Sequence, residues 1–395
     1  MQRVVGLPGA IMMGLGSILG TGVFLSLGLA AGLAGTTIVF GLIIAGALAF
    51  CNGLSTAQLA AVYPVSGGAY EYGYRMVHPW AGRSAGWLFI CAKSASAASA
   101  AIGFGGYFLQ LFQISGLSPW QVGAMLVIGL TSLCLTGMKR SNVANFVIVS
   151  ITILTLGGFV FMVAESFESA HWQGLGANTR SAFLTRDFWE STALLFVAYT
   201  GYGRVATLGE EIKNPTRNIP RAIFLTLVLS FVLYVAVVVV AIGAVGSDVF
   251  YESARRGAAP LQIIASVTDH PVTAGLLGIG AMTAMAGVLL NLILGVSRMM
   301  FAMAQRRDLP VSLANLSQKH STPYKCVILT AATIFALVLV RDVKITWSIS
   351  AFTVLVYYSV TNLSALRLPS DQRLYPRWIP MVGLAGCAGL LVFLL

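Results

Sequence analysis

The chain has 395 residues, of which 57% are hydrophobic and only 9% are charged, and its formal net charge is +11. A soluble domain carries about 25% charged residues, so this composition excludes a protein that covers its whole surface with water-compatible groups. Long runs without charge, the first between Arg3 and Glu71, instead predict membrane-spanning helices, each of which needs roughly 20 apolar residues. The predicted fold class is an all-α polytopic membrane protein.

In chain order, we expect about eleven transmembrane helices. Their approximate ranges are 7–31, 36–62, 84–112, 119–138, 142–164, 188–210, 221–245, 272–302, 325–341, 345–366 and 378–395. A weakly amphipathic piece near 257–269 lies in the connection before the eighth span.

The basic residues predict the orientation of these spans. About 17 of the 24 Lys and Arg residues fall on the side of the N-terminus and about 6 on the other side. The positive-inside rule therefore places the N-terminus in the cytoplasm and, with eleven spans, the C-terminus outside a cytoplasmic membrane. The net charge is then a signal of topology, and we expect no nucleic-acid partner.

The first span contains an unusual stretch, GLGSILGTGVF, at residues 14–24. Glycine weakens a helix, yet Gly14, Gly16, Gly20 and Gly22 all lie near the middle of this span. One interpretation is close helix packing through the G-x-x-x-G pair Gly16 and Gly20. The other is an interruption of the helix near Leu19, which is tolerable in a membrane only beside a cavity or a ligand. This stretch alone leaves both open.

A second stretch favours the interruption. The sixth span is centred on FVAYTGYGRV, where Gly201 and Gly203 flank Tyr202. Interrupted helices in the first and sixth of ten spans predict two five-helix halves, at about 7–165 and 188–366, related as an inverted repeat. The chain is then one transmembrane transporter domain over 1–395, with a peripheral helix at about 378–395.

Unpaired peptide groups at the two interruptions predict the ligand. The N–H groups around Gly20, Thr21 and Gly22 start the outer half-helix and suit a carboxylate, and the hydroxyls of Ser17 and Thr21 add donors. The carbonyls around the two interruptions suit an ammonium group. Amides for an anion beside carbonyls for a cation make a receptor for a zwitterion.

The carbonyls expected to meet the ammonium group belong to Ile18, Ala198 and Tyr199. Tyr202 either covers the site as an aromatic lid or is a packing or lipid-facing aromatic residue. Both interpretations of Tyr202 stay open.

Four motifs resemble those of the amino acid–polyamine–organocation permeases. They are GSILGTGVF in the first span, YPVSGGAYEY after the second, GEEIKNPTRNIPRAI after the sixth-span interruption and SRMMFAMAQRRDLP at the end of the eighth. The resemblance covers roughly residues 14–310 and implies ten helices in a five-plus-five inverted repeat, alternating access and an amino acid or amine as substrate. It also implies that the site is lined by Gly16, Ser17, Ile18, Gly20, Thr21, Gly22, Tyr199, Thr200, Gly201 and Tyr202, with Tyr202 in place of the family's aromatic gate.

Two positions depart from the family pattern. Thr152 stands where proton-linked members and some exchangers carry a lysine in the fifth span, and its hydroxyl is either a sodium ligand or a packing group. Lys93 lies about 15 Å into the third span, where it either faces an aqueous inner vestibule or takes part in proton coupling. Most relatives also have twelve spans, against the eleven expected here.

Charged and polar residues near the inner ends of the spans are candidates for gating or coupling. Arg204 either lies in a wet vestibule or closes an inner gate with Glu71, Glu210 or Glu211. Glu210 and Glu211 lie near the end of a half-helix, where their charge opposes the dipole, so we expect basic partners for them. Asn291 in the eighth span either packs against a neighbouring helix or contacts substrate, and the resemblance implies a possible sodium site between the first and eighth spans.

Other classes of protein fit the sequence less well. The four histidines are dispersed in connections and no span core carries Asp or Glu, so we expect neither an enzyme nor a metal cofactor. The predicted function is a permease for small to medium neutral amino acids, because no carboxylate lies in the expected site. An amine, polyamine or cationic amino acid permease or exchanger and a non-transporting membrane sensor are the alternatives. We expect a small-molecule substrate, the lipid bilayer, a coupling ion (sodium or a proton) and a monomer or weak homo-oligomer.

Overall fold

The computed structural model describes residues 5–64, 67–136, 142–173, 175, 181–207, 211–257, 259–317 and 323–394, with the backbone alone at 142, 256 and 257. Throughout these ranges the regular structure is helical, apart from one isolated bridge between Val5 and Ile212. The expectation of an all-α polytopic membrane protein is confirmed.

The helices follow the expected order of the spans. Their bounds are α1 Leu7–Ile18, α2 Leu27–Ala34, α3 Ile38–Val62, α4 Ala69–Tyr72, α5 Pro79–Leu111, α6 Pro119–Leu135, α7 Asn142–Val163, α9 Arg186–Tyr199, α10 Gly203–Thr207, α11 Pro215–Glu252, α12 Pro260–Val267, α13 Pro271–Gln305, α14 Tyr324–Val338, α15 Val343–Leu366 and α16 Trp378–Leu394. Proline occupies one of the first two positions of six of these helices, where its missing N–H costs no hydrogen bond.

Six apolar stretches of the described chain are long enough to cross a membrane by themselves. They are Leu7–Val62, Pro79–Leu111, Val143–Ser166, Pro215–Arg255, Pro271–Gln305 and Val343–Leu366. The apolar helices Pro119–Leu135, Tyr324–Val338 and Trp378–Leu394 are shorter. Leu7–Val62 holds two of the expected spans, and the total of eleven stays a prediction.

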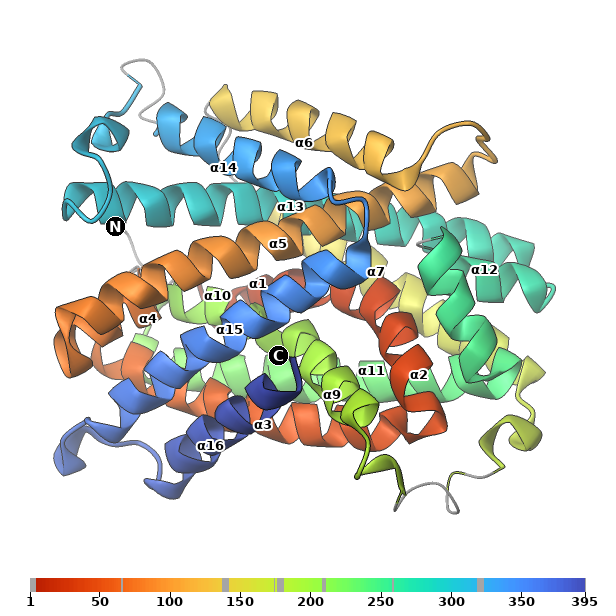
Figure 1. Cartoon of the computed structure of the whole chain (residues 1–395), viewed down its shortest axis with the longest axis horizontal. Helices are drawn as coiled ribbons and strands as arrows, with labels where there is room; N and C mark the ends of the chain where they lie inside the picture. The colour runs from red at the N-terminus through yellow and green to blue at the C-terminus, as the bar shows by residue number, and fades with distance from the viewer. Residues whose placement is uncertain are drawn as a thin grey trace.

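The long helices form two groups with the interrupted helices between them. One group contains α5, α6, α13 and α14, and the other contains α3, α11 and α16. Figure 1 shows α1 and α10 between these groups, and α2 leaving α1 at a sharp angle. The first of the two interruptions therefore lies inside the protein, where lipid cannot reach its peptide groups.

The seventh span is longer than the sequence predicts. Helix α11 continues to Glu252, past the expected end near residue 245, across a kink at Gly246 with φ of 78°. That backbone conformation strains residues with a side chain, so glycine permits the kink. The apolar run ends at the kink, which is why hydropathy alone placed the boundary there.

At the inner face, which we define as the end of the molecule that carries α4, α10 and the C-terminal end of α13, two of the sequence motifs meet. Glu71, from the motif at 63–72, forms ion pairs with Arg75 and with Arg306 at the end of the eighth span. The guanidinium of Arg306 also lies 5.3 Å from the ring centroid of Tyr70, within cation–π distance. These contacts fix the segment 67–77 against α13.

Asp308 makes a second connection between the same segments. Its carboxylate accepts hydrogen bonds from the hydroxyls of Tyr70, at 2.7 Å, and Tyr74, and from Arg83 at 2.8 Å. Burial alone raises the pKa of this carboxyl, but the hydrogen bonds from Tyr74 and Tyr70 and the charge of Arg83 outweigh burial and lower the pKa below its usual value.

Candidate functional site

The first transmembrane helix is interrupted where the sequence predicts. Helix α1 ends at Ile18, and Leu19 has φ of −78° and ψ of 87°. The N–H of Gly20 donates to the carbonyl of Ile18 at 3.0 Å, which closes a γ-turn around Leu19. The chain then resumes as a π-helix at Gly22–Ser26 that leads into α2. The N–H groups of such a first turn have no acceptor within their own helix.

The sixth span is interrupted more gently. Helix α9 ends at Tyr199, a 3₁₀ turn covers Thr200–Tyr202, and α10 starts at Gly203. The change from α to 3₁₀ geometry redirects carbonyls that would otherwise accept hydrogen bonds along the helix. One of them, on Thr200, accepts a hydrogen bond from the Tyr358 hydroxyl at 3.2 Å.

Glycine allows the two interruptions to touch. A Cβ atom on Gly201 would overlap the carbonyl of Ser17, so only glycine fits against the first interruption at this point. A Cβ on Gly22 would lie 3.0 Å from the Cβ of Ala198 in the sixth span. The peptide groups of the two interruptions are therefore neighbours.

The glycines of the first span also serve close packing. A Cβ on Gly14 would lie 2.6 Å from the Thr226 hydroxyl oxygen, and one on Gly20 would lie 2.7 Å from a methyl of Val288. The glycine-rich stretch therefore serves both close packing and the interruption: its glycines leave room for side chains of neighbouring helices, and the helix is interrupted at Leu19.

Tyr234 of α11 joins the two interruptions. Its hydroxyl lies 3.0 Å from the carbonyl oxygen of Ile18 and 3.0 Å from that of Ala198, and the side chain is fully buried. A hydroxyl has one proton, so it donates fully to only one of these carbonyls at a time. Two of the three carbonyls that the sequence assigns to an ammonium group, those of Ile18 and Ala198, therefore converge on one point, where Tyr234 supplies one donor for two acceptors.

A small cavity of about 30 Å³ lies at the interruptions. By the same measure a water needs about 10–15 Å³, so this cavity has room for about two or three waters. Its lining consists of Ser17, Ile18, Gly20, Thr21, Gly22, Lys93, Ser96, Val197, Ala198, Thr200, Gly201, Val288, Leu292 and Trp347.

A larger cavity, which we call the vestibule, adjoins the small one and has a volume of about 240 Å³. Six residues line both: Ser17, Lys93, Thr200, Gly201, Val288 and Leu292. The remaining lining comes from Gly67, Phe89, Gly203, Arg204, Thr207, Glu211, Asn291, Gly295, Arg298, Met299, Ala302, Tyr357 and Tyr358. Gly67 belongs to the segment held by the ion pairs of the inner face, so the vestibule extends from the interruptions toward that face.

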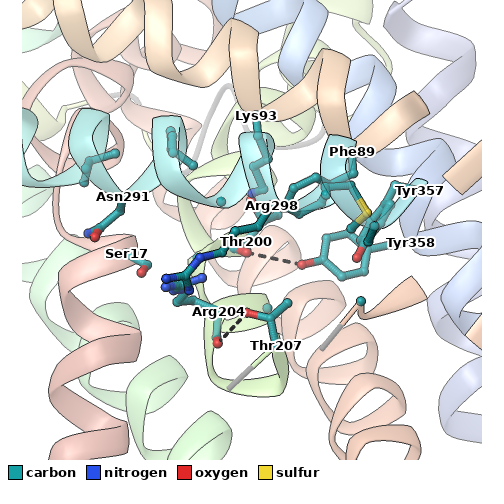
Figure 2. Close-up of a pocket in the computed structure, with 18 of the residues that line it drawn as sticks. Ser17, Phe89, Lys93, Thr200, Arg204, Thr207, Asn291, Arg298, Tyr357 and Tyr358 are labelled. Atoms are coloured by element: carbon teal, nitrogen blue, oxygen red, sulfur yellow. Dashed lines mark hydrogen bonds between the residues drawn. The ribbon is translucent and has the colours of Figure 1, made fainter. Parts of the chain in front are cut away.

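Cationic side chains dominate the vestibule. Lys93 of α5, Arg204 of α10 and Arg298 of α13 line it, and Glu211 is the one acid among the lining residues in the described part of the chain. Figure 2 shows Lys93 reaching from α5 toward the space beside Thr200. The Nε atom of Arg204 is buried without a hydrogen-bond partner among the described residues.

Most predicted site residues line one of the two cavities. Ser17, Thr200, Gly201 and Lys93 line both, whereas Ile18, Gly20, Thr21, Gly22 and Ala198 line the small cavity and Arg204, Glu211 and Asn291 line the vestibule. Gly16, Thr152, Tyr199 and Tyr202 line neither, and Glu210 lies outside the described residues.

The predicted residues that line neither cavity have other neighbours. The ring of Tyr199 lies 5.1 Å from that of Tyr234, and the ring of Tyr202 lies 5.5 Å from that of Tyr358. The Thr152 hydroxyl donates to Ile148 of its own helix at 2.8 Å. In this conformation, Tyr358 and not Tyr202 is the aromatic residue between the sixth span and the vestibule.

The structure narrows the partners considered for Arg204. Glu71 is engaged with Arg75 and Arg306, so it does not pair with Arg204 here. Glu211 lines the same cavity as Arg204. Glu210 lies outside the described residues. Of the two remaining acids named from the sequence, Glu211 is therefore the one that lines the same cavity as the Arg204 guanidinium.

A family model described as amino acid permease matches residues 9–395 of this chain. The chain belongs to the amino acid permease family. Its match covers both interruptions, the vestibule and the inner face, so the geometry above is that of a permease.

Named relatives agree with this family. The permease is 36% identical to an uncharacterized transporter of Mycobacterium tuberculosis, over 98% of this chain and 85% of the relative. It is 27% identical to the branched-chain amino acid permease BcaP of Bacillus subtilis, over 82% of this chain and 72% of that one. It is 24% identical to the serine/threonine exchanger SteT of the same organism, over 98% and 90% of the two chains.

Sequence reasoning missed several residues of the permease's site. Tyr234 lies one and two helical turns after Ser230 and Thr226, and this polar stripe on an otherwise apolar span was an available signal. Arg298 follows Asn291 and Gly295 at helical spacing, so one face of α13 carries all three. Trp347, Tyr357 and Tyr358 gave no comparable signal, because α15 reaches the site only through tertiary packing.

Proposed function

We propose that this permease is a secondary active transporter that moves small to medium neutral α-amino acids across the cytoplasmic membrane by alternating access. The observation that carries the proposal is the meeting of two interrupted helices beside a cavity that opens into a vestibule. Alternating access also needs a site that each side of the membrane reaches in turn, and interrupted helices at mid-membrane are typical of such sites.

Peptide groups hold the substrate in this proposal. The carboxylate binds the N–H groups of Thr21 and Gly22, and that of Gly20 when it leaves the Ile18 carbonyl, at the positive end of the helix dipole. The ammonium group takes the carbonyls of Ile18 and Ala198, on which the Tyr234 hydroxyl now lies. An ammonium group has three protons, so it satisfies both carbonyls where one hydroxyl cannot.

The charges around the site support a neutral amino acid. Lys93 lines the small cavity, and none of the described residues that line this cavity is acidic. A cationic side chain or a polyamine would therefore meet repulsion without a counter-ion. The side chain of a neutral amino acid instead extends past Val288 and Leu292, whose apolar surfaces line both cavities.

The membrane and the coupling mode belong to the same proposal. The basic residues place the N-terminus and the inner face in the cytoplasm. For sodium coupling, Ser17 and Asn291 are the polar groups on the facing sides of α1 and α13, and for proton coupling Lys93 is the candidate. Within the described residues, no three His, Cys, Asp or Glu side chains gather as metal ligands.

Uptake into proteoliposomes tests the proposal. Radiolabelled alanine, serine, leucine, lysine, glutamate and spermidine are offered separately to the purified permease, with a sodium gradient, with a pH gradient, or with unlabelled amino acid inside. We expect uptake of at least one neutral amino acid and little uptake of lysine or spermidine. Dependence on one of the three conditions identifies sodium coupling, proton coupling or exchange. Uptake of only lysine or spermidine would overturn the neutral class, and binding without any uptake would support a sensor.

A matched pair of variants tests the location of the site. Gly20→Leu places a side chain against Val288 in the small cavity, so transport should be lost while the protein stays monodisperse. Gly157→Leu is the control, because Gly157 lies in a transmembrane helix with open space where a Cβ would be. Wild-type uptake by a folded Gly20→Leu variant would place the substrate elsewhere.

A further inference from the structure

The two cavities differ in whether a whole amino acid fits. The small cavity at the interruptions holds about 30 Å³, whereas the vestibule holds about 240 Å³, eight times as much. Room for about two or three waters does not accommodate an amino acid with its side chain. Of these two cavities, the vestibule is the one large enough for a substrate molecule in this conformation.

The charges of the vestibule are those that a zwitterion requires. Lys93, Arg204 and Arg298 come from three different helices and line one space, and no ion pair joins any of them to an acid among the described residues. Arg204 in addition has a buried Nε without a partner in that part of the chain. An unpaired cation that is partly withdrawn from water, as Lys93 and Arg204 are, is costly unless an anion joins it.

We infer that the vestibule is a second binding site for the amino acid, in which side-chain charges and not peptide groups hold the ligand. The substrate's carboxylate binds between Arg204, Arg298 and Lys93, since guanidinium groups are suited to bidentate pairing with a carboxylate. Its ammonium group faces Glu211, the one acid among the described residues that line the cavity. The site takes the neutral amino acids proposed above, and the inference rests on that proposed function.

The position of the site gives it a role in transport. Lys93 lines both cavities, so the carboxylate can remain near the same ammonium group while it moves between the vestibule and the turn at Gly20. Arg298 is exposed to solvent at the vestibule, so the site is reached from outside the protein. The vestibule thus receives the amino acid on the cytoplasmic side before it enters the interruptions, or after it leaves them.

Equilibrium binding on purified protein tests the inference. The labelled alanine, serine, leucine and glutamate of the uptake experiment are the probes, and the proteins are wild type, Gly20→Leu, Arg298→Gln and Arg204→Gln. In Gly20→Leu, which should not transport, we expect weak binding of the transported amino acid to persist in the vestibule. This binding should weaken as potassium chloride rises from about 0.05 M to about 0.5 M, because salt screens charge pairs between partly exposed groups.

The arginine variants should lose binding in the vestibule, which Gly20→Leu keeps, and retain binding at the interruptions, which Gly20→Leu loses. Combined with Gly20→Leu, either Arg298→Gln or Arg204→Gln should lower the remaining affinity by about tenfold, the loss typical of removing one charged partner. Alone, each should raise the KM for export from the cytoplasmic side while binding at the interruptions persists. Arg298→Lys keeps the charge and should retain most of the affinity, and Arg217→Gln, which changes an exposed arginine outside the cavity, is the control.

The outcomes separate the two proposals. If wild type transports an amino acid but Gly20→Leu binds none of the probes, the vestibule site is overturned and the proposed function stands. If wild type neither binds nor transports any probe, both fail. If inorganic phosphate displaces the labelled amino acid from Gly20→Leu as well as the unlabelled amino acid does, the vestibule is a general anion site and the assignment to a zwitterion is wrong.

Discussion

The Tyr234 hydroxyl offers the sharpest test of the link between the two interruptions. Tyr234→Phe removes one oxygen from a fully buried side chain and leaves the ring in place against Tyr199. The oxygen lies 3.0 Å from both the Ile18 and the Ala198 carbonyls, so its loss removes the one donor that these two acceptors share. The carbonyl of Ile18 keeps the N–H of Gly20 as a donor.

The expected magnitude follows from these contacts. Hydrogen bonds between membrane helices contribute about 0.6 kcal/mol on average and about 1.7 kcal/mol at most. Because this hydroxyl serves two acceptors from two helices, we expect a loss of about 1–2 kcal/mol of stability. If the Tyr234 hydroxyl contacts both carbonyls in only one conformation of the transport cycle, a loss of about 1.4 kcal/mol in that conformation shifts the equilibrium between conformations about tenfold. Transport should therefore fall by up to about tenfold, with the fold intact.

Two measurements on the same preparation check this expectation. Unfolding in mixed micelles of increasing sodium dodecyl sulfate content gives the stability, and uptake of the transported amino acid gives the rate. Tyr107→Phe is the matched control, because its buried hydroxyl donates to one carbonyl, that of Phe24 at 2.8 Å, beyond the interruption. It should lose similar stability with a smaller effect on uptake. Wild-type stability and uptake in Tyr234→Phe would refute the reasoning.

Three further predictions concern packing, pH and the last helix. Gly201→Ala should abolish uptake, because the added methyl overlaps the first interruption, whereas Gly157→Ala should transport normally. The stabilisation from Asp308 should be complete above the ordinary pKa of 3.8 and lost as the pH falls through its lower folded-state pKa, since the unfolded chain takes up the proton first. Unfolding midpoints compared between about pH 7 and about pH 3 should show this loss in wild type, and Asp308→Asn should lack this part of the pH dependence. Asn52→Ala should remove the oxygen that accepts from the buried amide of Asn362 at 2.6 Å and from the Cys387 thiol of α16 at 3.5 Å, at a cost of about 1 kcal/mol and with looser packing of α16 in crosslinking experiments.

Much of the architecture follows from the sequence alone. Long charge-free runs require helices in a membrane, and this local requirement fixed the class of fold and the approximate place of each span. The interruption near Leu19 was also predictable, because GLGSILGTGVF combines an apolar run with residues that disfavour a helix. The spans and the interruption can be predicted because each depends only on the residues of a short stretch of chain and on the apolar interior of the bilayer.

The tertiary structure decided how these elements make a site. No local pattern states that the Tyr234 hydroxyl meets carbonyls from two other helices, or that Arg204 and Arg298, from separate helices, share one cavity with Lys93. It also placed Tyr202 against Tyr358, although its position beside the interruption suggested a lid. Helical periodicity gives the face on which a side chain lies, but the partner of that face depends on how the helices pack. The sequence therefore determined where the backbone is interrupted, and packing determined which side chains surround the interruption.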